Sequence, residues 1–157
     1  STTVPSGTAV TSFNANFSFE ANVTWNWDAA SGTWLRFYNG TTPDKQLDGK
    51  QNNAVNVIVQ TIHTTLGPWV ENSGGGLEVQ AELWNTSGPA KIFRNGVMIE
   101  GTWSRGDKSS PTVFKDAKGK VIAMNPGRTW VELFPDTSQF SFVAAPVTTT
   151  TAKSSKK

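Results

Sequence analysis

Closely spaced turn signals between alternating apolar and polar residues constrain this chain most strongly, and they are densest in residues 90–133. Asn95-Gly96 separates two alternating segments, and this dipeptide is typical of the type I′ turn, in which both central residues need positive φ. Asp116–Gly119 joins a second pair of short apolar segments, and Asn125-Pro126-Gly127 turns the chain once more. The region therefore predicts consecutive β-hairpins.

The rest of the chain repeats this organisation. Residues 13–39 alternate on both sides of an Asp28–Gly32 turn, which predicts a third hairpin. Val55–Thr65 is β-branched nearly throughout and is expected at the centre of a sheet. Leu77–Trp84 alternates again, and Gln139–Ala144 could form one further strand. The polar segment 40–53 and the glycine-containing segment 66–76 are expected to be loops.

No helical periodicity persists over the length of a helix. We therefore predict an all-β fold, an antiparallel sandwich or small barrel of about ten short strands built from consecutive hairpins. The 157 residues fit one domain. We expect a linker in residues 1–11, a single β-domain in residues 12–145 and a disordered, Thr- and Lys-rich tail in residues 146–157.

The charge of the chain argues against nucleic-acid binding. The formal net charge is +2, but Lys153, Lys156 and Lys157 are three of the 14 basic residues, so the remainder carries 11 basic against 12 acidic residues. The basic excess therefore belongs to the tail and does not describe a basic face. The sequence also contains no Cys, which excludes disulfides and thiol chemistry.

The sequence offers no catalytic set and no cofactor or metal motif, and we expect a protein that is not an enzyme. His63 is the single histidine and lies in a β-branched segment without an identifiable serine and carboxylate beside it. Asp44 and Asp48 lack the spacing of a calcium loop and are expected to be solvated. An enzymatic alternative remains if two of Glu82, Glu100, Asp107 and Glu132 line one pocket with raised pKa values.

Tryptophans are the candidate ligand-binding residues. Trp25 and Trp27 share one face of a strand, and Trp34 can pair with them across the turn. A row of exposed rings would stack on sugars or peptides, but with seven tryptophans in a small domain the core is the favoured place for most of them. Trp69 follows Gly67-Pro68 in an expected loop, where an exposed ring is typical of binding sites.

Several segments together carry a resemblance to a known family. These are VTWNWDAASGTWLRFYNG, NAVNVIVQTIHTTLG, KIFRNGVMIEGTW, SSPTVFKDAKGK and NPGRTWVEL. In this order they resemble the C-terminal domain of the YerB-like bacterial lipoproteins, a family of unknown function, from about Phe13 to Pro135. The resemblance implies an extracytoplasmic protein attached to the bacterial cell membrane by a lipidated N-terminus, with an α/β domain before this one; both would lie outside this sequence.

Two functional hypotheses follow. The first is a non-catalytic accessory or interaction domain of a bacterial cell-surface lipoprotein, whose partner is another protein or the N-terminal domain that the resemblance implies. The second is a carbohydrate or cell-wall binding module that uses Trp69 with Trp25, Trp27 or Trp34. In both, the membrane is contacted only through an anchor outside this chain.

Overall fold

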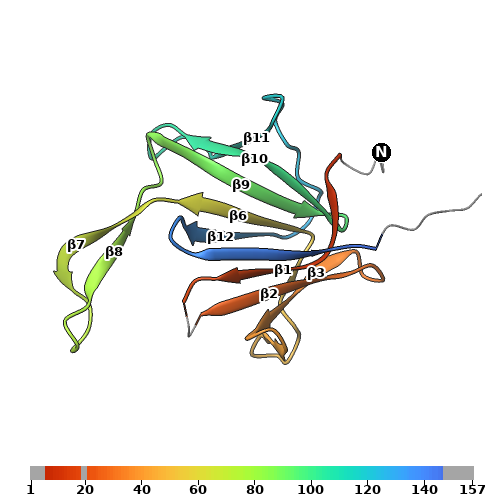
Figure 1. Cartoon of the computed structure of the whole chain (residues 1–157), viewed down its shortest axis with the longest axis horizontal. Helices are drawn as coiled ribbons and strands as arrows, with labels where there is room; N and C mark the ends of the chain where they lie inside the picture. Colours follow the sequence, from red (N-terminus) through yellow and green to blue (C-terminus); the bar gives the residue numbers. More distant parts are fainter. Residues whose placement is uncertain (1–5, 19–20, 147–157) are drawn as a thin grey trace, which may run out of the picture.

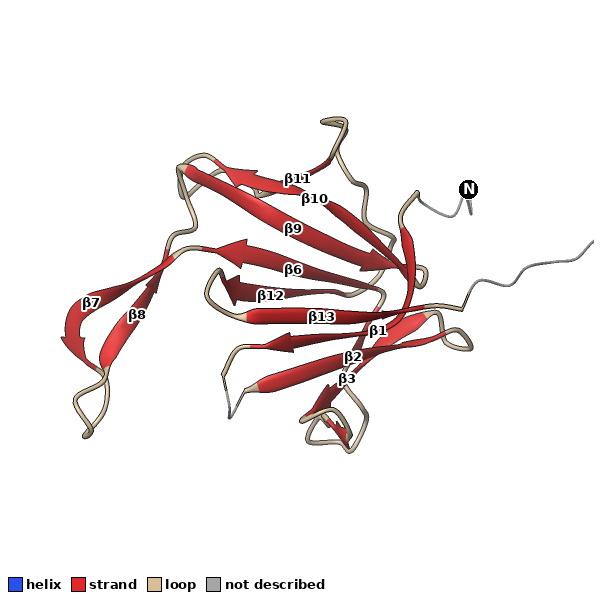
Figure 2. Ribbon diagram, viewed as in Figure 1, coloured by secondary structure: helices blue, strands red, loops and turns tan. Residues whose placement is uncertain are grey.

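The computed structural model describes residues 6–18 and 21–146, and these residues form thirteen strands and no helix (Figures 1 and 2). The strands are β1 (Thr8–Asn16), β2 (Asn22–Asp28), β3 (Thr33–Tyr38), β4 (Thr42–Pro43), β5 (Asn53–Ala54), β6 (Asn56–Ile62), β7 (Thr64–Val70), β8 (Leu77–Ala81), β9 (Thr86–Arg94), β10 (Val97–Arg105), β11 (Val113–Asp116), β12 (Thr129–Pro135) and β13 (Gln139–Ala144). The predicted all-β class is confirmed. No helix in the described part of the chain has the length and apolarity needed to cross a membrane.

One large sheet curls into a half-barrel. Its strand order is β12-β6-β9-β10-β1-β2-β3-β4, with β11 added to β10, β13 to β1 and β5 to β3. Strands β7 and β8 form a separate two-stranded hairpin that extends away from the half-barrel (Figure 1). Pairing is antiparallel except between β12 and β6, where Thr129 is opposite Asn56 in a parallel ladder.

The predicted turn chemistry is present at the β9–β10 hairpin. Asn95 and Gly96 have φ values of 54° and 69°, and Arg94 pairs directly with Val97 across the two-residue connection. Both central residues therefore have the positive φ of a type I′ turn. The turn after β11 is held by Asp116, whose Oδ1 accepts hydrogen bonds from the backbone amides of Lys118 and Lys120, each at 2.9 Å.

Strand β6 separates two apolar clusters. Val57 and Val59 face the inside of the curl, where they pack with buried residues of β1, β2 and β3. Ile58 and Ile62 face the other side, where β9, β10 and the segment after β11 cover them. Because both faces of β6 are buried, β-branched residues occupy nearly the whole strand, as the sequence predicted.

A buried amide fixes the segment before β12 to β6. Asn56 has no exposed surface, and its Nδ2 donates to the carbonyl oxygen of Asn125 at 2.9 Å and to Thr129 Oγ1 at 3.0 Å. Its Oδ1 accepts from the Asn125 amide at 2.9 Å. These hydrogen bonds satisfy both the donor and the acceptor of the Asn56 amide, so its burial does not leave an unpaired polar group.

Three boundaries differ from the sequence predictions. Strand β1 begins at Thr8, inside the expected linker 1–11, because Ala9 pairs with β10 and Val10 is buried. The expected loop 66–76 is strand as far as Val70. The expected strand 55–65 is divided at His63 between β6 and β7. The tail expected in residues 146–157 lies outside the described residues from residue 147 onward.

Candidate functional site

The β7–β8 hairpin, called the arm below, is amphipathic. Leu66 pairs with Val79 and Val70 pairs with Leu77, so these four side chains share one face. They are 68%, 59%, 63% and 40% exposed in that order. On the opposite face the Glu78 side chain covers the backbone of Gly67, where an added Cβ would meet Glu78 Oε1 at 2.1 Å. The arm therefore presents an uncovered apolar face with its polar side chains turned away.

The tip of the arm is a polar turn. The amide of Glu71 donates to the carbonyl oxygen of Gly76 at 2.8 Å, which closes the hairpin. Asn72 Oδ1 accepts from the amides of Gly74 and Gly76 at 3.0 and 3.1 Å. The glycine-rich segment that the sequence marked as a loop is thus an ordered turn between two strands.

Acidic residues are the charged residues of this region. Residues 64–90 contain Glu71, Glu78 and Glu82 and no Lys or Arg. Trp69 lies on β7 and is 70% exposed, while Trp84, at the base of the arm, is 44% exposed with Lys108 Nζ 4.7 Å from its ring centroid. The arm combines an apolar face with a negative charge.

The root of the arm is held by an exposed ion pair. His63 Nδ1 lies 2.9 Å from Asp136 Oδ2, and the Asp136 amide donates to the carbonyl oxygen of Ile62 at 2.9 Å. The hydrogen bond and charge of Asp136, with a smaller effect of Glu82, raise the pKa of His63. Among the described residues no hydroxyl group forms a hydrogen bond with this imidazole.

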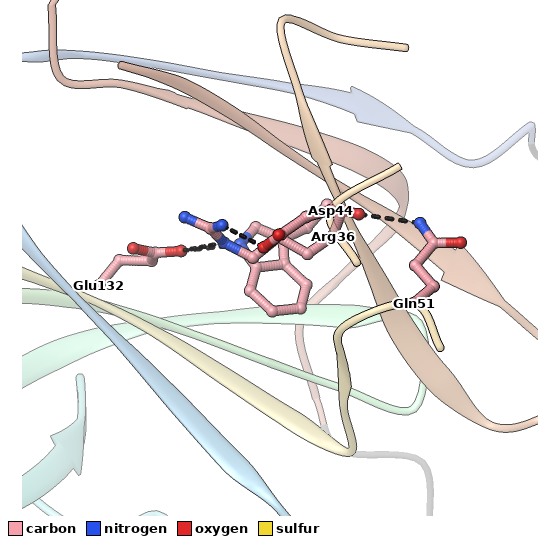
Figure 3. Close-up of polar contacts among 5 residues, drawn as sticks. Arg36, Asp44, Gln51 and Glu132 are labelled. Atoms are coloured by element: carbon pink, nitrogen blue, oxygen red, sulfur yellow. Dashed lines mark hydrogen bonds and ion pairs between the residues drawn. The ribbon is translucent and has the colours of Figure 1, made fainter. Parts of the chain in front are cut away.

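A buried ionic cluster lies between β3 and β12 (Figure 3). Arg36 Nη1 donates to Asp44 Oδ2, and Arg36 Nε donates to Glu132 Oε1 at 3.4 Å. Trp25 Nε1 donates to the same Glu132 oxygen at 3.0 Å. Arg36, Asp44 and Glu132 are only 8%, 7% and 7% exposed. The cluster joins two strands that share no ladder.

Aromatic rings surround the Arg36 guanidinium. Its Cζ lies 4.8 Å from the Tyr38 ring centroid, 4.9 Å from that of Trp130 and 6.0 Å from that of Trp25. Burial lowers the pKa of Arg36. Contacts with Tyr38 and Asp44 and the charge of Glu132 together raise it by more than burial lowers it, so the pKa of Arg36 lies above its ordinary value. Both carboxylates hold a permanent cation, which is the arrangement of a structural bridge.

The polar loop 40–53 supplies Asp44 to this cluster. The Asp44 amide donates to the Arg36 carbonyl oxygen at 3.1 Å, and the Arg36 amide donates to the Asn52 carbonyl oxygen at 2.9 Å. Gln51 Nε2 donates to the Arg36 carbonyl oxygen at 2.8 Å (Figure 3). The loop therefore folds back onto β3 and positions a carboxylate.

Sequence reasoning missed this cluster. The signal was present, because Arg36 alternates with Trp34 and Tyr38 on the side of β3 that faces the core. A charge at an inward position requires a partner. The partner Glu132 lies 96 residues away, so the sequence alone did not identify it.

The four tryptophans proposed from sequence do not form one site. Trp25 and Trp34 have no exposed surface, and their rings pack in the core, so neither can stack on a ligand. Trp27 is partly buried against that core, with its ring centroid 5.3 Å from that of Trp34. Trp69 is separated from them on the arm and alone presents an open ring.

The carboxylates of the enzymatic alternative are also dispersed. Glu82 lines a hollow of about 540 Å³ at the base of the arm, and Glu100 lines another of about 690 Å³ beside β10. Glu132 is in the ionic cluster. Hydrogen bonds from Ser109 and Ser110 lower the pKa of Asp107 to about 2, the opposite of the shift that this alternative requires.

No group of three or more His, Cys, Asp or Glu side chains with the geometry to hold a metal ion occurs in residues 6–18 and 21–146. Asp44, expected to be solvated, is buried against Arg36, whereas Asp48 is exposed and pairs with Lys50 at 2.9 Å. Hydrogen bonds from Lys50 lower the pKa of Asp48. The two loop aspartates therefore have different partners.

Comparison with known proteins gives a family and a fold. Residues 13–131 match the family described as "Protein of unknown function (DUF3048) C-terminal domain". The structure is similar to the crystal structure of the YerB protein from Bacillus subtilis, with a TM-score of 0.64 and 18% sequence identity. The similarity covers 87% of this chain and 45% of that one, so the chain spans less than half of the YerB chain. No curated protein matches the sequence.

Proposed function

Because the chain belongs to the family of the DUF3048 C-terminal domain, whose function is unknown, we propose that it is a non-catalytic interaction domain of a bacterial cell-surface lipoprotein. The observation that supports this proposal is the arm. Leu66, Val70, Leu77 and Val79 lie on one face of the hairpin, and all four side chains are exposed. An isolated two-stranded hairpin is marginally stable in water, and a partner on this face would stabilise it.

The charge of the arm specifies the chemistry of its partner. Glu71, Glu78 and Glu82 are the charged residues of segment 64–90, which contains no Lys or Arg. The partner is therefore a protein surface with an apolar centre and Lys or Arg at its edge. An anionic membrane surface does not fit, because it would repel these carboxylates.

The first partner to test is the part of the full-length protein that precedes this domain, expressed separately. Isothermal titration against this domain should show binding that Val79→Ser weakens at least about tenfold, since the substitution places a polar group in the apolar contact. Val131→Ser is the matched control. Val131 is 44% exposed on β12, outside the arm, and its replacement should leave affinity unchanged.

The same titration separates the outcomes. Binding that Val79→Ser and Val131→Ser reduce equally would contradict a contact through the arm. Binding that strengthens at high salt would contradict the cationic edge, because salt screens attraction between exposed opposite charges. No binding to the preceding part would remove it as the partner, and titrations with other apolar, basic-edged surface proteins of the same bacterium would then decide the proposal.

Extracytoplasmic attachment through a lipidated N-terminus is part of this proposal. Its support is the resemblance of the sequence to the YerB-like lipoproteins, which implies such an anchor. Metabolic labelling of the full-length protein with an alkyne fatty acid should give a labelled protein accessible to external protease in cells without an outer membrane. An unlabelled protein in the cytoplasmic fraction would contradict it.

Trp69 supports a second candidate, a carbohydrate or cell-wall binding module. Its ring is 70% exposed, and an open indole can stack on a sugar. Titration with peptidoglycan fragments should then show heat that Trp69→Ala abolishes and Val79→Ser retains. Heat that both variants leave intact, or no heat across the panel, would remove this candidate.

A further inference from the structure

A second surface feature lies at the opposite end of the molecule from the arm, beside the start of β1 (Figure 1). Strand β10 is paired with β1 through Val97 and Met98, and with β11 from Gly101 to Ser104. Between these two partners, Ile99 and Glu100 lie on an edge that neither strand covers. A hollow of about 690 Å³ opens there, a volume within the range of small-molecule sites.

Three cations line this hollow. They are Arg94 at the end of β9 and Lys118 and Lys120 in the turn after β11. Arg94 Nη1 donates to the neutral Asn125 Oδ1 at 3.0 Å, and none of the three forms an ion pair with a described carboxylate.

The two acidic residues that line the hollow are already engaged. Asp116 Oδ1 accepts the amides of Lys118 and Lys120, which fixes its carboxylate to its own turn. Glu100 Oε1 lies 2.7 Å from Lys91 Nζ. The lining therefore holds three cations against two carboxylates, and Glu100 is paired with Lys91 outside it, so a positive charge remains and an anion can bind without displacing an ion pair of these cations.

The remainder of the lining is largely apolar. Met98, Ile99 and Ile122 form its inner wall, and Val121 at its edge is 58% exposed. Met98, Ile99 and Ile122 are largely buried, but a purely inorganic anion would leave Val121 facing water. A molecule with both an anionic group and an apolar part would use both kinds of surface.

We infer that this hollow binds a small amphipathic anion, with a carboxylate or phosphate group near Lys118, Lys120 and Arg94 and an apolar body against Ile99, Val121 and Ile122. This site is independent of the arm. In the described part of the chain, the hydrogen bonds of Lys118 and Lys120 are made by their backbone amides and their side chains form no ion pair, so both side chains are available to a ligand.

The test is a titration of ¹⁵N-labelled protein followed by amide chemical shifts. The probes are hexyl phosphate, hexanoate, inorganic phosphate and hexanol. Hexyl phosphate or hexanoate should cause saturable shifts at Thr8, Ile99 and Ala123, with weaker effects from inorganic phosphate and hexanol. The first two probes distinguish a phosphate from a carboxylate as the preferred group, and preference for either supports the inference.

Charge reversal provides the second measurement. Lys118→Glu/Lys120→Glu should reduce affinity for the better probe at least about tenfold, because it replaces two attractive contacts by repulsion. The matched control is Lys45→Glu/Lys115→Glu, which makes the same change in net charge outside the hollow. Equal affinity in the two double variants, or saturable shifts with hexanol alone, would overturn the inference, as would no saturable shift at these amides with any probe.

Discussion

Arg36 on β3 and Glu132 on β12 connect two strands of the half-barrel that share no backbone ladder. Their contact, with Asp44 and Trp25, closes the side of the curl where hydrogen bonding between strands stops. Side-chain contacts therefore join β3 and β12, which no backbone hydrogen bonds connect. The ion pair is buried, so its effect on stability depends on keeping every partner in place.

Removing one partner of this cluster should be costly. Glu132→Ala leaves Arg36 with one carboxylate and Trp25 Nε1 without an acceptor, and we expect a loss of about 3–5 kcal/mol in the free energy of unfolding. Urea denaturation followed by tryptophan fluorescence measures it. Glu100→Ala, which removes an exposed partner of Lys91, should change stability by less than about 0.5 kcal/mol. Similar effects of the two substitutions would contradict the closing role of Glu132.

The two carboxylates of the cluster should repel each other once their cation is removed. Arg36→Met leaves Asp44 and Glu132 buried without it and should destabilise the fold strongly. Adding Asp44→Asn and Glu132→Gln to this variant should recover part of the stability, since the amides carry no charge. Denaturation of both variants makes the comparison. A triple variant less stable than Arg36→Met alone would show that repulsion is not the cause.

The β9–β10 turn should tolerate no side chain at Gly96. An alanine there adopts a positive φ, which costs about 1–2 kcal/mol, and its Cβ would also meet Trp27 Nε1 at 2.8 Å. Gly119→Ala separates the two effects, because Gly119 has a φ of 78° with nothing within 4 Å of an added Cβ. Gly96→Ala should therefore be the more destabilising in thermal unfolding. Equal melting temperatures would contradict the contact with Trp27.

The root of the arm should respond to pH. Because Asp136 raises the pKa of His63 above its ordinary value of 6.5, protonated His63 stabilises the fold. This contribution is fully present below the unfolded pKa and is lost as pH rises through the folded one. Nuclear magnetic resonance titration of the imidazole should give a pKa above 6.5 that Asp136→Asn lowers. A pKa unchanged by Asp136→Asn would exclude the pair.

Asp107 should make the fold sensitive to acid. Hydrogen bonds from Ser109 and Ser110 hold its pKa at about 2, below the ordinary value of 3.8. Its contribution is present above pH 3.8 and is lost as pH falls through about 2. Urea midpoints measured between these values should fall more steeply for the natural protein than for Asp107→Asn. Parallel curves would contradict the shift.

Features that depend on adjacent residues could be predicted from the sequence. Strand pairs between residues far apart in the sequence could not. Asn95-Gly96 specified its turn because only φ preferences of adjacent residues matter there. The valines of β6 indicated a central strand, but nothing local indicates that β12 joins β6 in parallel. Strand β8 was predicted within residues 77–84, but residues 66–70 of β7 were predicted as loop because the glycines of segment 66–76 dominate the pattern. The burial of Trp25 and Trp34 depends on which strands pack over each ring. The alternation of residues along one strand does not contain that information.

The parallel ladder between β6 and β12 also determines when β6 can complete its pairing during synthesis of the chain. Thr129 lies 73 residues after its neighbour Asn56, so a ribosome must release most of the chain before β6 acquires its second flank. Until then a strand rich in valine and isoleucine has an open side that other nascent chains can join. A chain truncated before residue 129 should therefore aggregate during translation instead of surviving as a smaller folded protein.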